Sequence, residues 1–323
     1  MSDPLLDAIA AVSDKSPAIK RALGLAAQRI IALEAVVTPP PPPPPPPPPA
    51  SGKPFTLFRY GASFNQGTPS TYGQHYANVV VGYGDDNKGA TVAPARLLDY
   101  RTSLELTDST DAGASLAGVT LAEATQFGWA LRDSSGSLIY DPKWMTHYGD
   151  VGNAAYSARW CANVGARMQT YNLPGLFLDN VTALRGDFGG VANATAWSSD
   201  AAFEDAVAAH IGRMRAALPG AFLMANAGRA RDRVAWWKRL AALGVNALVV
   251  ESFDGSDAHI ALIQAAQNAG AEAWALVYGD PASAAVRALA VKFASVTNGR
   301  GGFAVNSSGP DPWNENWTKA IVP

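Results

Sequence analysis

An unbroken run of prolines at residues 39–49 constrains this chain of 323 residues more than any other feature. Each proline fixes φ and lacks a backbone N–H, so the run cannot join a helix or a central strand and adopts an extended polyproline II conformation. At about 3.1 Å per residue it forms a stiff spacer roughly 30–35 Å long. We therefore expect three parts: residues 1–38, a linker at 39–54, and a domain at 55–323.

Residues 17–37 carry the apolar pattern of a coiled-coil helix. Their apolar side chains recur at alternating intervals of four and three residues, as in the a/d seam of a heptad repeat. An isolated helix of this length is marginal in water and needs a partner surface. Two interpretations stay open: a helical hairpin formed with residues 3–12, or a stalk through which several copies associate. The seam consists of Ile19, Leu23, Ala26, Ile30, Leu33 and Val37.

Strand-like apolar runs alternate with helix-like segments after the prolines, a pattern typical of parallel α/β proteins. We expect helices at residues 154–171, 200–218, 231–243, 256–268 and 281–297. We expect strands at residues 56–61, 78–83, 97–104, 176–180, 222–226, 247–252, 273–278 and 302–306. Eight such units suit the size of a (β/α)₈ TIM barrel. An extra hairpin at residues 128–141 is expected over the barrel mouth.

Charge, cysteine content and missing motifs exclude several partners and cofactors. The formal net charge is −2 and the basic residues are scattered, so no nucleic-acid partner is expected.

No stretch approaches the roughly 18 apolar residues of a membrane span. The N-terminus lacks a secretory signal pattern, which predicts synthesis in a cytoplasm. The single cysteine, Cys161, forms no internal disulfide and is expected to be buried. The histidines show no metal-ligand spacing and no phosphate-binding glycine motif occurs, so no metal or cofactor is expected.

Two carboxylates end apolar strands of the expected barrel. Asp179 and Glu251 each follow three apolar residues. An ionised side chain at a buried strand end costs several kcal/mol unless it is paired or used. In a TIM barrel the active site lies at the C-terminal ends of the strands. Both carboxylates are therefore expected at one barrel mouth, together with Asn226 and Asn306, which also end predicted strands.

Paired carboxylates are what glycosidic bond cleavage requires. One protonates the leaving oxygen, and the other attacks the anomeric carbon or activates water. Aromatic and amide side chains near such a pair suit sugars, although most of these aromatics could instead pack helices or the core. With Asp179 and Glu251 as catalytic residues, the expected substrate-binding residues are Arg59, Tyr60, Trp129, Arg132, Trp144, Asn180, Asn226, Tyr278 and Asn306.

Four motifs carry a resemblance to known enzymes: GWALRDSSGSLI, then GLFLDNV at residues 175–181, then LMANAG and VVESF. With them, the span from residue 55 to about 317 resembles the glycosyl hydrolase barrels related to the endo-α-1,4-polygalactosaminidase family (family 114). GLFLDN is also similar to the fourth-strand nucleophile motif of α-galactosidase-like barrels, in which that aspartate works with a carboxylate ending the sixth strand. The resemblance implies a TIM barrel with Asp179 as nucleophile or base and Glu251 as general acid.

The residues beside the two carboxylates favour the same assignment. Glu251 follows an apolar run, so it is expected to keep its proton. Asp179 adjoins Asn180, whose side-chain amide could donate to it, so Asp179 is expected to stay ionised.

The combination of a heptad segment, a rigid rod and a sugar-active barrel fits a bacteriophage tail or fibre protein. In that interpretation residues 1–38 associate as a trimer and bind other virion tail proteins. The barrel then binds and cleaves a host surface polysaccharide, and the virion is assembled in the host cytoplasm. Two alternatives stay open: a non-catalytic receptor-binding or structural tail protein, and a free bacterial polysaccharide hydrolase exported by another route.

Overall fold

A computed structural model describes residues 55–59, 76–81, 95–106, 118–227, 233–280 and 283–306, with the backbone alone at 55–59, 305 and 306. The predictions for residues 1–38 and for the proline linker lie outside these residues. The strands are β1 (Phe55–Arg59), β2 (Asn78–Val81), β3 (Arg96–Thr102), β4 (Glu105–Leu106), β5 (Tyr140–Asp141), β6 (Thr146–Tyr148), β7 (Gly175–Asp179), β8 (Phe222–Asn226), β9 (Ala247–Glu251), β10 (Glu272–Tyr278) and β11 (Gly301–Asn306). The helices are α5 (Leu121–Gln126), α6 (Ala154–Tyr171), α7 (Asp200–Ala217), α8 (Val234–Ala242), α9 (Asp257–Asn268) and α10 (Ala284–Val296).

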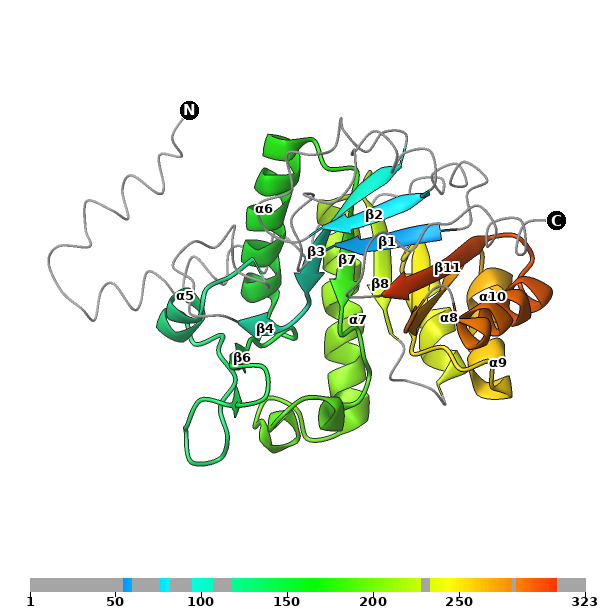
Figure 1. Cartoon of the computed structure of the whole chain (residues 1–323). Helices are drawn as coiled ribbons and strands as arrows, with labels where there is room; N and C mark the ends of the chain where they lie inside the picture. The colour runs from blue at the N-terminus through cyan, green and yellow to red at the C-terminus, as the bar shows by residue number, and fades with distance from the viewer. Residues whose placement is uncertain are drawn as a thin grey trace, which may run out of the picture. The chain divides into compact units, whose positions relative to one another are not determined.

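A parallel sheet curled into a barrel dominates the fold (Figure 1). Its strands follow the order β1-β11-β10-β9-β8-β7-β3-β2 around a closed ring, and all neighbours are parallel. The pair β1 and β11 closes the ring through two registered positions, Phe55 with Phe303 and Thr56 with Ala304. The predicted α/β class, the eight strands and a TIM-barrel-like sheet are therefore confirmed.

Side-chain alternation along each strand produces two apolar layers. Phe177 of β7 belongs to the cluster that fills the barrel interior, together with Val249 of β9. Leu176 and Leu178, on the opposite face of β7, pack in the larger cluster between the sheet and the helices. Strands buried on both faces read as continuous apolar runs, which is why the sequence identified them.

Polar caps set where the helices begin. Four helices begin with a side chain that accepts a hydrogen bond from a backbone N–H of the first turn. The capping residues are Asn153 for α6, Ser199 for α7, Ser256 for α9 and Ser283 for α10. These bonds satisfy donors that have no partner inside the helix. Asn172, the residue after helix α6, takes the left-handed conformation common at helix C-termini. The five helices predicted after the prolines are confirmed as α6 to α10, with ends within three residues of the predicted ones. Within the described part, no helix is long and apolar enough to cross a lipid bilayer.

An excursion between β3 and α6 forms a second, smaller sheet. Its three antiparallel strands follow the order β4-β6-β5. The predicted hairpin at residues 128–141 is present in part, through the antiparallel bridge between Arg132 and Leu138. The strands β5 and β6 form a further hairpin that the sequence did not indicate.

Candidate active site

Side-chain alternation places the two carboxylates inside the barrel at its C-terminal end. Asp179 lies two residues beyond Phe177, and Glu251 two residues beyond Val249, and both of these apolar side chains face the interior. Residues two apart on a strand share a face. Asn226 ends β8, the strand between β7 and β9. The prediction that these three side chains share one rim is confirmed, and their catalytic role stays a prediction.

A continuous chain of hydrogen bonds joins the carboxylates. Asn226 Nδ2 donates to Asp179 Oδ1 at 2.8 Å and to Glu251 Oε2 at 2.9 Å. The Tyr100 hydroxyl donates to Asp179 Oδ2 at 2.5 Å, and the Tyr278 hydroxyl donates to Glu251 Oε1 at 2.5 Å. Bonds to ionised oxygens are shorter and stronger than neutral ones. The chain runs across the neighbouring strands β3, β7, β8, β9 and β10.

The shared amide limits the distance between the two carboxylates. One nitrogen of Asn226 contacts both, so Asp179 Oδ1 and Glu251 Oε2 lie no more than about 5.7 Å apart. Two like charges at this distance repel each other, and the donors around them offset part of that repulsion.

Burial raises the pKa of Asp179 above its usual range. The nearby charge of Glu251 raises the pKa further, whereas hydrogen bonds from Tyr100, Asn226 and the backbone N–H of Asn180 lower it. The sequence predicted that Asp179 stays ionised, so the direction of this shift is a correction. The physical reason is tertiary: the carboxylate lies inside the barrel and faces a second carboxylate, which its neighbours in sequence do not reveal.

The residue after each carboxylate has an unusual backbone. Asn180 and Ser252 both have φ of 56°, a left-handed conformation that costs about 1 kcal/mol or more for a non-glycine residue. The turn directs the Asn180 side chain away from Asp179, and its amide donates to Glu105 Oε1 at 2.9 Å. The expected bond from the Asn180 side-chain amide to Asp179 is therefore wrong, and the backbone N–H of Asn180 makes that bond instead, at 2.9 Å.

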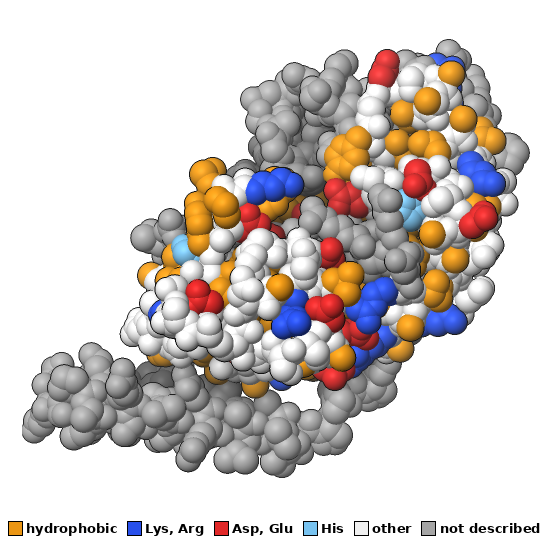
Figure 2. All heavy atoms as spheres, turned by 90° about the horizontal axis from the view of Figure 1, so that it is seen from below, with side chains coloured by type: hydrophobic (Ala, Val, Ile, Leu, Met, Phe, Trp, Pro, Cys, Tyr) orange, Lys and Arg blue, Asp and Glu red, His pale blue; other side chains and the backbone are white. Residues whose placement is uncertain are grey.

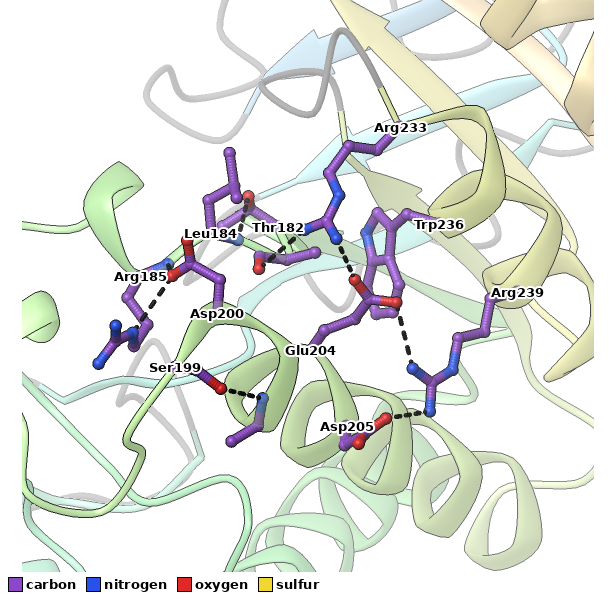
Figure 3. A network of polar contacts seen from close by, with 12 residues as sticks. Thr182, Leu184, Arg185, Ser199, Asp200, Glu204, Asp205, Arg233, Trp236 and Arg239 are labelled. Carbon is purple, nitrogen blue, oxygen red and sulfur yellow. Dashed lines mark hydrogen bonds and ion pairs between the residues drawn. The ribbon is translucent and has the colours of Figure 1, made fainter.

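The loop that follows Asp179 is anchored to helix α8. Arg233 Nη1 donates to the carbonyl of Ala183 at 3.2 Å, and Trp236 Nε1 donates to the carbonyl of Val181 at 3.2 Å. Figure 3 shows Arg233 extending between this loop and Glu204 of α7, with which it forms an ion pair at 2.6 Å. Two helices therefore hold the backbone that carries the first carboxylate.

The structure places the other predicted binding residues in different surroundings, and of those in this paragraph only Tyr278 contacts a carboxylate of the pair. Trp129 is only 6% exposed and packs in the core, so it does not face the mouth. Arg132 is exposed and bonds Gly136 O within its own turn. Trp144 is 57% exposed on the β5–β6 turn, and Tyr278 is 48% exposed beside Glu251.

Three predicted residues have no described side chain. The backbone of Asn306 pairs with Tyr278 at the same rim, and the backbone of Arg59 pairs with Val81. Tyr60 lies outside the described residues.

Sequence reasoning missed Tyr100 and Glu105. Tyr100 lies two residues beyond Leu98, whose side chain fills the barrel interior, so alternation along β3 was a usable signal. Glu105 is buried in β4, a strand of two residues that is too short to show a periodic pattern. Over the described ranges, no group of three or more His, Cys, Asp or Glu side chains is arranged to hold a metal ion.

Comparison with solved structures identifies the barrel as similar to glycoside hydrolases. The family 36 α-galactosidase AgaA from Geobacillus stearothermophilus aligns with 84% of this chain, with a TM-score of 0.52 and 8% identity. The galactosidase domain of the α-galactosidase–sucrose kinase AgaSK aligns with 83%, with a TM-score of 0.52 and 10% identity. Kfla1895, solved in complex with isomaltose, aligns with 84%, with a TM-score of 0.54 and 10% identity.

These similarities concern the fold. The chain spans 41%, 39% and 45% of the length of the three structures. Sequence identities of 8–10% do not indicate that the substrate is shared. No family model and no curated protein matches the sequence. A glycoside-hydrolase-like barrel is supported, and the placement in family 114 stays a prediction.

Proposed function

We propose that the barrel is a retaining glycoside hydrolase with Asp179 and Glu251 as its catalytic pair. The observation that carries the proposal is the amide of Asn226, which contacts both carboxylates and holds Asp179 Oδ1 within about 5.7 Å of Glu251 Oε2. Retaining glycosidases place the two carboxyl groups about 5–5.5 Å apart, whereas inverting enzymes need about 6.5–9.5 Å. The α-galactosidases and the isomaltose complex among the similar structures support a carbohydrate ligand.

In this mechanism one carboxylate attacks the anomeric carbon while the other protonates the departing oxygen. Water then cleaves the glycosyl ester, with the second group now acting as base. The free protein must therefore hold one proton on the pair. Burial raises the pKa of Asp179, which favours Asp179 as the acid, whereas the resemblance to α-galactosidase-like barrels implies that Asp179 is the nucleophile. Both assignments use the same two residues.

Substitution of each carboxylate tests the pair. Galactomannan, dextran and an α-1,4-linked galactosamine polymer are the substrates, and the release of reducing ends is measured. Asp179→Asn and Glu251→Gln should each lower the rate at least about 100-fold, because general acid–base groups contribute that much or more. Glu272→Gln is the matched control, because Glu272 begins β10 at the other end of the strand and pairs with Arg96.

Azide rescue then assigns the roles. On 4-nitrophenyl glycosides, which need little acid assistance, the variant lacking the acid keeps much of its first-step rate and the variant lacking the nucleophile does not. Azide accelerates turnover of whichever variant lacks the group it replaces, and a glycosyl azide of retained configuration marks the acid/base variant. Wild-type rates in both variants would rule out catalysis by this pair.

The alternative is a barrel that binds the polysaccharide without cleaving it. Retention of the wild-type protein by one of these polymers, with no new reducing ends, would favour the receptor-binding interpretation. The two outcomes are distinct because binding and cleavage are measured separately.

We also propose that residues 1–38 attach the barrel to a phage tail. The proposal rests on the heptad seam at residues 17–37 and on the proline rod after it. Immunogold labelling of purified virions with an antibody to the barrel should mark the tail. Labelling absent from virions but present on the producing cell would favour the free hydrolase.

A further inference from the structure

The tip of the β5–β6 hairpin exposes large apolar side chains. Trp144 is 57% exposed, Met145 is 75% exposed, and Tyr140 on β5 is 45% exposed. Figure 2 views the molecule from the side toward which strands β3 and β7 run in Figure 1. At the upper left of its coloured surface, hydrophobic side chains gather near a basic side chain and a histidine. Exposed apolar groups that cluster in this way mark interaction sites more often than isolated ones do.

A buried carboxylate anchors this hairpin. Asp141 accepts hydrogen bonds from the backbone N–H of Lys143 at 2.8 Å, from the Tyr148 hydroxyl at 3.0 Å and from the backbone N–H of Gly189 at 3.2 Å. A Cβ atom at Gly189 would lie 2.6 Å from the Asp141 carboxyl, so only glycine allows this approach. Met145 has φ of 51°, a strained conformation that a well-held turn can maintain. The exposed tryptophan therefore sits on a preorganised support.

The small sheet connects this tip to the carboxylates. Glu105 on β4 lies opposite Tyr148 on β6 in the antiparallel sheet. The Glu105 side chain also accepts a hydrogen bond from the side-chain amide of Asn180, the residue after Asp179. Two strand positions and part of the turn separate Tyr148 from Trp144, which places the indole roughly 10 Å beyond the root of the hairpin. A ligand in contact with both ends must be longer than one sugar ring.

We propose that Trp144 forms a distal subsite for a polymeric carbohydrate whose reacting end lies between Asp179 and Glu251. The proposal rests on the hydrolase function above and extends it to the length of the substrate. The Lys143 ammonium lies over the indole, 4.7 Å from the ring centroid, yet more than half of the side chain remains exposed. A sugar ring stacks its apolar C–H face on such an indole, and its hydroxyls can accept from Lys143.

Affinity electrophoresis of the full chain tests the subsite. The gels contain galactomannan, dextran or the α-1,4-linked galactosamine polymer, and KM is measured on the polymer and on a 4-nitrophenyl glycoside. Trp144→Ala should weaken retention and raise the polymer KM roughly tenfold, the change expected when a stacking contact of about 1.4 kcal/mol is lost. Its KM on the small glycoside should stay unchanged, and Trp144→Tyr should keep most of the affinity. Tyr171→Ala is the matched control: it is also an exposed aromatic below a cation, but lies at the end of α6, just before β7 begins.

Each outcome decides the proposal. Unchanged polymer affinity in Trp144→Ala, equal loss in Tyr171→Ala, or equal loss on the small glycoside would overturn the distal subsite. Failure of the wild-type chain to bind any of the three polymers would also overturn it. If Trp144→Ala changed the sedimentation of the chain but not its retention by the polymers, the tip would instead be a contact between copies. Retention that depends on Trp144 without any hydrolysis would keep the subsite and reject the catalytic proposal.

Discussion

Replacing Glu251 by Gln should remove the activity of the barrel and should stabilise it at a pH above the raised pKa of Asp179, where that carboxylate has lost its proton. The substitution deletes one of two like charges that lie within about 5.7 Å of each other across the Asn226 amide. A glutamine can fill the same bonds, because its oxygen can accept from Asn226 and its NH₂ can donate to the Tyr278 oxygen. The change therefore removes charge without leaving an unsatisfied polar group.

The distance sets the size of the effect. Coulomb's law at about 5.7 Å gives about 0.7 kcal/mol at the dielectric constant of water and about 3 kcal/mol at an effective value of 20. We expect a gain of about 1–3 kcal/mol in the free energy of unfolding. For a domain of this size that corresponds to a rise in Tm of about 2–10 °C.

The gain should depend on pH in a defined direction. The pKa of Asp179 in the folded protein is raised by burial and by Glu251. The folded state therefore holds this proton more tightly than the unfolded chain, whose Asp pKa is about 3.9. The stability contributed by Asp179 is greatest below that value and falls as the pH rises through the raised pKa. The advantage of Glu251→Gln should thus be full at pH 8 and vanish near pH 3.5.

Thermal unfolding followed by tryptophan fluorescence measures this gain. All nine tryptophans follow the proline run, so the signal reports on the barrel. Glu272→Gln is the matched control with the opposite sign, because Glu272 pairs with Arg96 at 3.2 Å and its neutralisation leaves a half-buried guanidinium without that partner. A Tm for Glu251→Gln equal to or below the wild type at pH 8, or a gain that persists at pH 3.5, would refute the charge argument.

Three further predictions follow from the same structure. Tyr100→Phe removes a hydrogen bond that lowers the pKa of Asp179, so the limb of the pH–rate profile that Asp179 governs should move up by about 1–2 pH units; this is the acid limb if Asp179 is the nucleophile and the alkaline limb if it is the acid. Arg233→Ala removes the hydrogen bond to the carbonyl of Ala183 in the loop after Asp179, so kcat should fall about tenfold. The free energy of unfolding, measured by chemical denaturation, should fall by only about 1 kcal/mol. Ile30→Asp in the seam at residues 17–37 should dissociate the oligomer in sedimentation without changing the barrel's Tm; a wild-type monomer would contradict the stalk.

The sequence alone determined the eight barrel strands, helices α6 to α10 and the two carboxylates at strand ends. These features are local: apolar runs of strand length, serine and asparagine caps, and a charged residue directly after buried positions. Alternation with a period of two also fixes which side chains enter the barrel once the strands are known. For that reason Asp179, Asn226 and Glu251 could be assigned to one rim before any coordinates.

Only the tertiary structure decided how these groups interact. The position of the Asn226 amide between two carboxylates, and the raised pKa of Asp179, depend on the order of β7, β8 and β9 around the ring. Trp129 lies in the predicted hairpin at residues 128–141 and Trp144 lies just after it. One is buried and the other exposed, because the excursion between β3 and α6 folds into its own small sheet. Burial and charge proximity are sums over neighbours distant in sequence, and no local pattern of residues encodes those sums.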